Sequence, residues 1–246
     1  MKADPAAQLR LLDLQAADTA TAQLQHRRHT LPELAVIKEC TARAGELAIE
    51  SGDLQARIDD VAQEQTRLEK DIEQVRARRS RDEARLAGGG LPAKELENLQ
   101  HEVGTLQRRQ NTLEDELLEV MEQRETLDVE AAQLAERRAE VDTRRQAAQT
   151  SRDAASAEID AALQQRAAER DRVAAEIPSD LLALYEKIRA QNGGVGAAAL
   201  KHRRCEGCRI EISGHDLSAA RTAAPDDVLR CDNCRRVLVR TAESGL

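Results

Sequence analysis

The chain has 246 residues, of which 33% are charged, and its one aromatic residue is Tyr185. Because large cores normally draw buried area from aromatic side chains, this composition argues against an ordinary globular enzyme and favours long helices or coiled coil. The net charge is −8, yet residues 195–246 carry nine Lys/Arg against seven Asp/Glu, so the acidic balance lies in the first 194 residues and does not suit indiscriminate nucleic-acid binding.

Two apolar ladders with alternating spacings of four and three follow one another, from Ile37 to Leu86 and from Leu99 to Ala148. Such a seven-residue repeat keeps one stripe of a helix facing a partner helix. Between the ladders lies the segment 88–92, in which three glycines end one helix and Pro92 suits the first turn of the next. We therefore predict a mainly α fold, a long antiparallel coiled-coil hairpin within one chain rather than a parallel dimer. Cys40 lies on the first ladder and is predicted to be a small buried side chain.

Proline residues divide the rest of the chain. Thr30 and Glu33 fit a capping box around Pro32, which predicts a break in the first arm. Pro178 is expected to end the second arm, and Ser179 to cap a short helix that contains Tyr185. The predicted domains are the hairpin, residues 1–177, and a C-terminal domain, residues 178–246, with short strands around two cysteine pairs.

Four of the five cysteines form two C-x2-C pairs separated by 22 residues. Each pair can present two thiolates from a tight turn, eased here by Gly207 and Asn233, and two facing pairs complete a tetrahedron around zinc. Four protein ligands leave no open position, so the site is predicted to hold one structural Zn²⁺ and to perform no chemistry. The predicted ligands are Cys205, Cys208, Cys231 and Cys234.

Five arginines crowd these cysteines: Arg203, Arg204, Arg209, Arg235 and Arg236. They are candidates for contact with a protein partner, RNA or DNA. Equally, they can offset the charge of −2 that Zn²⁺ and four thiolates carry. His202 and His215 are interpreted as surface residues, because four cysteines already complete the site.

The segments Ile177–Arg189 and Val228–Leu238 make the chain resemble a bacterial family of coiled-coil proteins with a four-cysteine zinc ribbon. The resemblance implies a hairpin with the ribbon packed near its open end, and a non-enzymatic role. Some members of that family act in flagellar or secretion gene control, as chaperone-like partners of an alternative sigma factor or as RNA-binding regulators. Relatives usually have Gly where this chain has Arg235, a departure that puts the second turn in doubt.

These observations favour a cytoplasmic, non-enzymatic adaptor whose ribbon engages a protein of the transcription or secretion machinery. Nucleic-acid binding through the arginines is the alternative, although the lack of aromatic residues removes the usual base-stacking surface. A structural spacer that dimerises through its apolar ladders is a third hypothesis. No run of about 18 apolar residues and no signal-peptide pattern occurs, so no membrane segment is expected. No catalytic constellation or small-molecule site is predicted.

Overall fold

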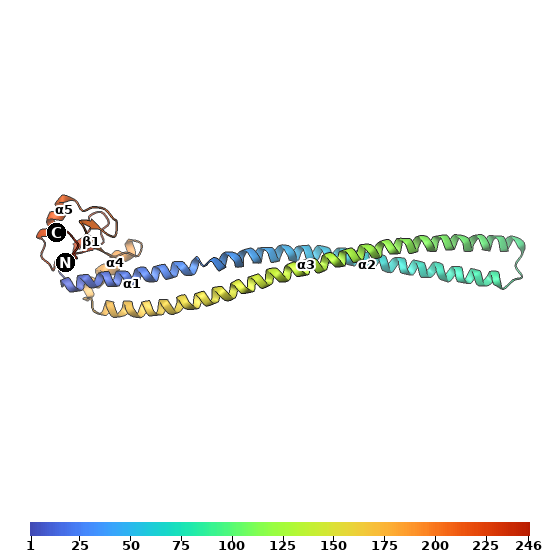
Figure 1. Cartoon of the computed structure of the whole chain (residues 1–246), viewed down its shortest axis with the longest axis horizontal. Coiled ribbons are helices and arrows are strands. Elements are labelled where there is room, and N and C mark those ends of the chain that lie inside the picture. Colours follow the sequence, from blue (N-terminus) through green and yellow to red (C-terminus); the bar gives the residue numbers. More distant parts are fainter. The chain divides into compact units, whose positions relative to one another are not determined.

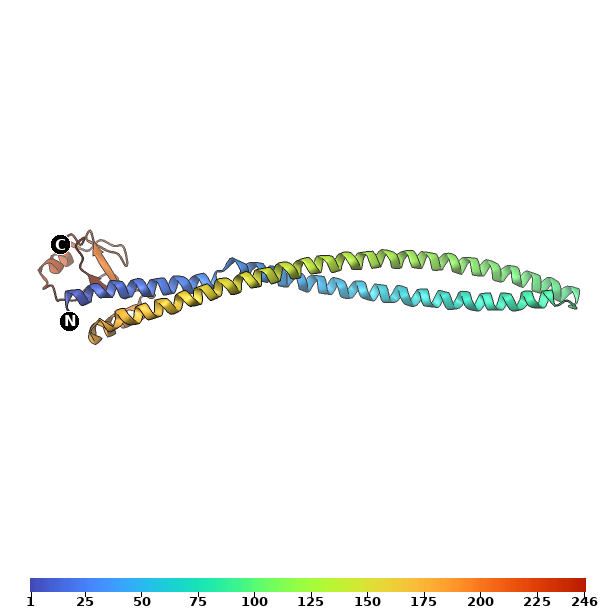
Figure 2. The same ribbon diagram turned by 60° about the horizontal axis from the view of Figure 1, so that its bottom comes forward.

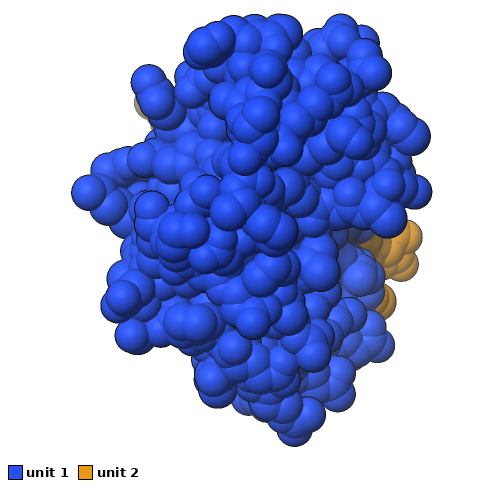
Figure 3. Space-filling model, turned by 90° about the vertical axis from the view of Figure 1, so that its left-hand side faces the viewer, with its two compact units in different colours: residues 1–34, 149–246 blue, residues 35–148 orange.

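The computed structural model describes residues 1–246 and divides them into two compact units. Unit 1 combines the two ends of the chain, residues 1–34 and 149–246, and unit 2 comprises residues 35–148. Figure 3 shows the surface of unit 1, which combines the N-terminal segment with residues 149–246. Helices α2, Pro32–Ala87, and α3, Ala93–Ala175, each contribute residues to both units.

In unit 2, α2 and α3 run antiparallel to each other and are joined through the predicted glycine turn (Figures 1 and 2). Their facing stripes bury a row of leucines, among them Leu47 and Leu54 of α2 against Leu127 and Leu134 of α3. Cys40 is 2% exposed, as predicted for a small residue on the seam. The mainly α hairpin is therefore confirmed, and its seam is filled within one chain.

Two of the predicted helix caps are wrong. Thr30 does not cap α2, because its hydroxyl donates to the carbonyl oxygen of His26, at the end of helix α1 (Pro5–His29). Ser179 is the first residue of helix α4 (Ser179–Gln191) rather than its cap, and no side chain caps that end. The breaks themselves are where the prolines predict them, since proline sets the helix start through its backbone and needs no partner.

Unit 1 contains a four-stranded sheet in the order β2-β1-β4-β3. Its strands are β1 (Ala197–Lys201), β2 (Arg204–Cys205), β3 (Leu229–Arg230) and β4 (Val237–Val239). The two central strands, β1 and β4, pair in parallel, while β2 and β3 pair antiparallel at the edges. Directly after the first cysteine pair, where a short strand is expected, the pairing is limited to a single bridge between Arg204 and Glu211.

Helix α1 packs on this sheet and supplies much of its core. Leu11 and Leu14 of α1 are fully buried beside Tyr185 and Leu181 of α4 and Val237 of β4. The first residues of the chain continue the contact, because Ala3 N–H donates to the carbonyl of Asp226 and Val228 N–H donates to that of Met1. A ribbon with no aromatic residue thus gains an apolar core from the helix at the other end of the sequence.

Helix α5, Gly214–Thr222, lies between the two cysteine pairs and was missed by sequence reasoning. The Ser213 hydroxyl accepts a hydrogen bond from the backbone N–H of Asp216 and thereby caps this helix. The signal was present, because Ser followed three residues later by an acidic residue is the pattern of a capped helix start.

Candidate metal centre

The two C-x2-C pairs form two turns of matching backbone geometry. In the first, the N–H of Arg209 donates to the carbonyl of Cys205 at 2.6 Å, and in the second, the N–H of Arg235 donates to that of Cys231 at 2.7 Å. Each turn is closed by the residue two positions after its second cysteine. Cys205 N–H donates to the carbonyl of Ile210, and Cys231 N–H donates to the carbonyl of Arg236. The repetition places two thiols of each turn on the side that faces the other turn.

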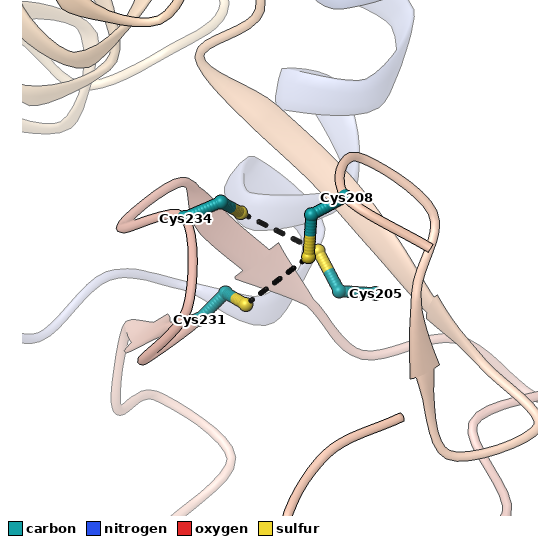
Figure 4. Close-up of side chains that lie close together, drawn as sticks. All are labelled: Cys205, Cys208, Cys231 and Cys234. Atoms are coloured by element: carbon teal, nitrogen blue, oxygen red, sulfur yellow. Dashed lines mark hydrogen bonds between the residues drawn. The ribbon is translucent and has the colours of Figure 1, made fainter. Parts of the chain in front are cut away.

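The four sulfur atoms converge (Figure 4), and all of them lie within 4.8 Å of one another. Cys205 Sγ is 3.8 Å from Cys234 Sγ, and Cys208 Sγ is 3.8 Å from Cys231 Sγ. A disulfide would need about 2.05 Å, whereas a tetrahedron with Zn–S bonds near 2.3 Å has sulfur–sulfur edges of about 3.8 Å. The site therefore fits one structural zinc ion and no disulfide.

The left-handed backbone that each turn needs is not where the sequence predicted it. Gly207 and Asn233 both have negative φ, whereas Arg209 (φ 61°) and Arg235 (φ 60°), the residues after each pair, are left-handed. Arg235 therefore takes up the conformation that glycine would adopt more readily, and the second turn keeps the hydrogen bonds of the first. Gly207 is favoured for another reason, since a Cβ there would lie 2.8 Å from Cδ of Arg236, and the Arg236 side chain would have to shift.

Backbone N–H groups are aimed at the sulfur atoms. Burial raises the pKa of the Cys205 thiol to about 12, although the N–H groups of Cys208 and Gly207 act in the opposite direction. Burial acts to raise the pKa of Cys234 as well, but the N–H of Arg236 and the neighbouring thiols outweigh it and lower this pKa to about 7. The turns thus favour thiolates in part, and a bound cation would supply the charge that makes all four stable.

The sequence-predicted arginines lie in two different environments. Arg203, Arg204, Arg209 and Arg235 are exposed. Arg236 is half-buried, and its guanidinium donates to the carbonyl oxygens of Val195, Gly207 and Asn192. The structure therefore uses Arg236 to join the first cysteine turn to the loop after α4. His202 and His215 are exposed and lie outside the group of metal-ligating atoms.

A buried polar network next to the ribbon was not found by sequence reasoning. Tyr185 Oη donates to Asp18 Oδ2 at 2.7 Å, and the side chain of Asp18, only 2% exposed, also pairs with Arg170 at 2.7 Å and Arg189 at 3.0 Å. Gln15 accepts the backbone N–H of Gly196 at 2.7 Å. This network ties α1, α3, α4 and the start of β1 together. Asp18 and Arg170 are 152 positions apart in sequence, so no local sequence pattern predicts this network.

Gly196 is the second glycine with a steric requirement. A Cβ at this position would lie 2.7 Å from the ring of Tyr185 and 2.7 Å from its carbonyl oxygen. Only glycine permits this approach of the strand to the helix, which explains why a glycine directly precedes β1.

Two family models match the chain. A CT398-like coiled coil hairpin domain matches residues 14–193, and a C4-type zinc ribbon domain matches residues 204–238. An uncharacterized protein of Mycobacterium tuberculosis is 41% identical over 242 residues, covering 98% of each chain. An uncharacterized protein of Mycobacterium leprae is 33% identical and covers 87% of this chain and 91% of its own length.

Solved structures agree with this fold. A structure from Mycobacterium smegmatis has a TM-score of 0.88 at 40% identity and covers 98% of this chain and all of its own. CT398 from Chlamydia trachomatis has a TM-score of 0.69 at 16% identity, with 96% of this chain and 98% of its own covered. At that identity the likeness concerns the fold alone. None of the helices combines the length and the apolar character needed to cross a bilayer.

Proposed function

Because the chain belongs to the family of proteins with a CT398-like coiled-coil hairpin domain, here followed by a C4-type zinc ribbon, we propose that it is a cytoplasmic, non-enzymatic adaptor. Its zinc ribbon engages a protein of the transcription or secretion machinery. The observation that carries the proposal is the closed set of four cysteines, whose sulfur atoms lie within 4.8 Å of one another. A metal with four protein ligands shapes a surface and leaves no position for a substrate.

The surface offered to the partner consists of the exposed arginines beside the metal, Arg203, Arg204, Arg209 and Arg235. Three of them, Arg203, Arg204 and Arg209, make no ion pair within the chain, while Arg235 lies 4.0 Å from Asp232. Unpaired guanidinium groups on a rigid turn can form bidentate contacts with carboxylates of a partner. Their second role, offsetting the charge of the zinc–thiolate centre, is compatible with this one.

The test is crosslinking with mass spectrometry in the native cell, comparing the wild-type chain with Cys231→Ser. The expected result is a defined set of transcription or secretion proteins, crosslinked through residues 200–240 and lost in the variant. Cys40→Ser is the matched control, because Cys40 is buried on the seam of unit 2 and should leave the partners unchanged. Recovery of the same proteins with Cys231→Ser would contradict the proposal.

Nucleic-acid binding through the same arginines is the second candidate, favoured by their exposure and by the lack of ion pairs at Arg203, Arg204 and Arg209. It predicts that RNA or DNA affinity falls steeply as salt rises, and that replacing Arg203, Arg204 and Arg209 by Ala reduces this dependence. Arg236 should not be included in that variant, since its three carbonyl contacts make it part of the fold. An unchanged affinity of the triple variant would contradict this candidate.

A further inference from the structure

Unit 2 carries an exposed apolar stripe on α3, on a face that the hairpin seam does not use. Leu118 is 58% exposed, Met121 48% and Val129 53%, and together with Ala132 they line a shallow groove of about 690 Å³. At about 100° per residue these positions share one face of the helix, and the centre of that face lies about 140° round from the centre of the seam residues Leu113 and Leu127. The stripe spans about 21 Å, which matches four turns of a second helix.

The stripe lies in the most acidic part of the chain. Between residues 111 and 136 there are nine Asp/Glu and one Arg. Three of the carboxylates, Glu122, Glu125 and Asp128, line the groove itself. Asp128 lies near Arg124 at 3.9 Å, whereas none of the ion pairs of the chain includes Glu122 or Glu125. The groove therefore combines an apolar floor with two carboxylates that have no partner, beside Arg124, whose guanidinium donates to Gln65 of α2.

We propose that this groove docks a basic amphipathic helix of a protein partner, with apolar residues on the Leu118–Met121–Val129 stripe and Lys or Arg beside Glu122 and Glu125. Apolar anchors at helical spacing are how a helix fills such a groove, and opposite charge at the rim sets orientation and partner choice. Met121 suits this role, because an unbranched thioether adapts to the side chains that meet it. The inference rests on the proposed adaptor function and names a second contact surface, separate from the ribbon.

Charge argues against a second copy of the chain as the occupant. The same acidic stripe on another copy would bring like charges together, which is unfavourable. Most of the arginines near the glycine turn, which could otherwise attract the groove of another copy, are paired within the chain. Arg81, whose guanidinium donates to the carbonyl of Ala77, is the exception. Arg76 pairs with Glu114, Arg78 with Glu102 and Arg85 with Glu95. A basic helix from a different protein satisfies both the apolar floor and the free carboxylates.

The test uses the full zinc-loaded chain and a fluorescent synthetic peptide of Leu, Ala and Lys, with Leu at helical spacing and Lys along both flanks. Anisotropy titration should show saturable binding that Leu118→Ser with Met121→Ser weakens about tenfold or more. Ile49→Ser is the matched control, since Ile49 is 69% exposed outside the groove and its replacement should leave the affinity within about twofold. Circular dichroism checks that the variants keep their helical content.

The charge part of the proposal has its own pair of variants. Glu122→Lys with Glu125→Lys should weaken the Lys peptide about tenfold or more and strengthen a peptide with Glu in place of Lys. Glu97→Lys with Glu140→Lys changes the net charge equally at exposed sites outside the groove and should have a small effect. If the two double variants weaken peptide binding equally, or if a scrambled peptide binds as tightly as the amphipathic one, the attraction is unspecific and the proposal is wrong.

Two further outcomes separate this inference from the proposed function. Crosslinked partners that survive Leu118→Ser with Met121→Ser but need the cysteines would support the adaptor function and overturn the groove. Groove-dependent peptide binding, with no partner crosslinked at the ribbon, would support the groove and overturn the proposed function of the ribbon. A dimer in sedimentation that the same double variant abolishes would show that the groove binds a second copy, and would also overturn the proposal.

Discussion

The interiors of the two units are built in different ways. In unit 2, each layer of the seam repeats the last, with leucines such as Leu68 and Leu113 buried between ion pairs that are largely exposed. In unit 1, the interior depends on two sites that occur once each. One is the cluster of four cysteines, and the other is the buried pair of Asp18 and Tyr185. Stability is thus distributed in one region and concentrated in the other.

This difference matters because exposed ion pairs contribute little, while a buried charge without its partners costs several kcal/mol. A substitution in unit 2 removes one layer among many. A substitution in the metal centre or the Asp18 network removes an interaction for which the chain has no second copy. The comparison can be tested by substitutions of graded severity.

The largest expected effect is loss of the metal. Chelation of zinc, or Cys231→Ser, removes binding worth roughly 10–16 kcal/mol in structural sites, and should melt the β-strands of the ribbon. The helical signal of unit 2 should persist, because its seam contains none of the four ligands. Zinc content and far-UV circular dichroism measure both. Cys40→Ser should retain the metal, and a Cys231→Ser chain that binds zinc as tightly as wild type would contradict the assignment.

Next in size is Asp18→Ala. The substitution leaves Arg170, Arg189 and the hydroxyl of Tyr185 facing a carboxylate-sized gap, at an expected cost of about 3–5 kcal/mol. Tyr185 is the one aromatic residue of the chain, so its fluorescence during denaturation reports on this region. Arg28→Ala breaks the exposed pair with Asp160 and should change the midpoint little. Equal effects of the two variants would mean that the buried network adds nothing.

In unit 2, Leu113→Ala should cost about 2–5 kcal/mol, because Leu113 is 1% exposed and packs against Leu68 and Ile72. The effect should appear in the unfolding of the α2–α3 pair and leave the Tyr185 fluorescence of the native protein unchanged. Leu118→Ala is the matched control, since Leu118 is 58% exposed on the same helix. A similar loss at Leu118 would show that its face is already covered.

Repetition also explains what could be read from the sequence. A seam that recurs every seven residues predicts the hairpin, and C-x2-C spacing predicts the metal ligands, because both are local patterns. The Asp18 network joins residues that are far apart in sequence, and α1 contributes to the ribbon core for reasons that only the fold reveals. The left-handed conformation at Arg209 could not be anticipated, since arginine gives no sign of it as glycine would. At Arg235, the glycine that relatives usually have was the one indication of such a conformation.

The pH dependence should differ between the units. Burial, followed by the hydrogen bond to Asp18, raises the pKa of Tyr185 above its ordinary value of 10.0. The folded chain therefore keeps the neutral phenol while the unfolded chain ionises, so unit 1 should lose stability as pH rises above about 10, at up to about 1.4 kcal/mol per pH unit. Tyr185→Phe should remove this component, read as the difference between the two pH profiles in denaturant unfolding. Parallel profiles would contradict it.

The smallest expected effect concerns the turn that follows the last cysteine. Arg235 has φ 60°, a left-handed conformation that costs a non-glycine residue roughly 1–2 kcal/mol. Glycine avoids this cost, but its greater freedom in the unfolded chain lowers the free energy of unfolding by about 0.5–1 kcal/mol. Arg235→Gly should therefore leave stability unchanged or raise it by about 1 kcal/mol, with zinc affinity intact in competition with a chromophoric chelator. Arg221→Gly is the same substitution inside helix α5 and should destabilise by about 1 kcal/mol. The opposite signs isolate backbone geometry from the loss of charge, because both variants remove one exposed arginine. If both destabilised alike, the side chain of Arg235 would matter to the second cysteine turn more than its backbone does.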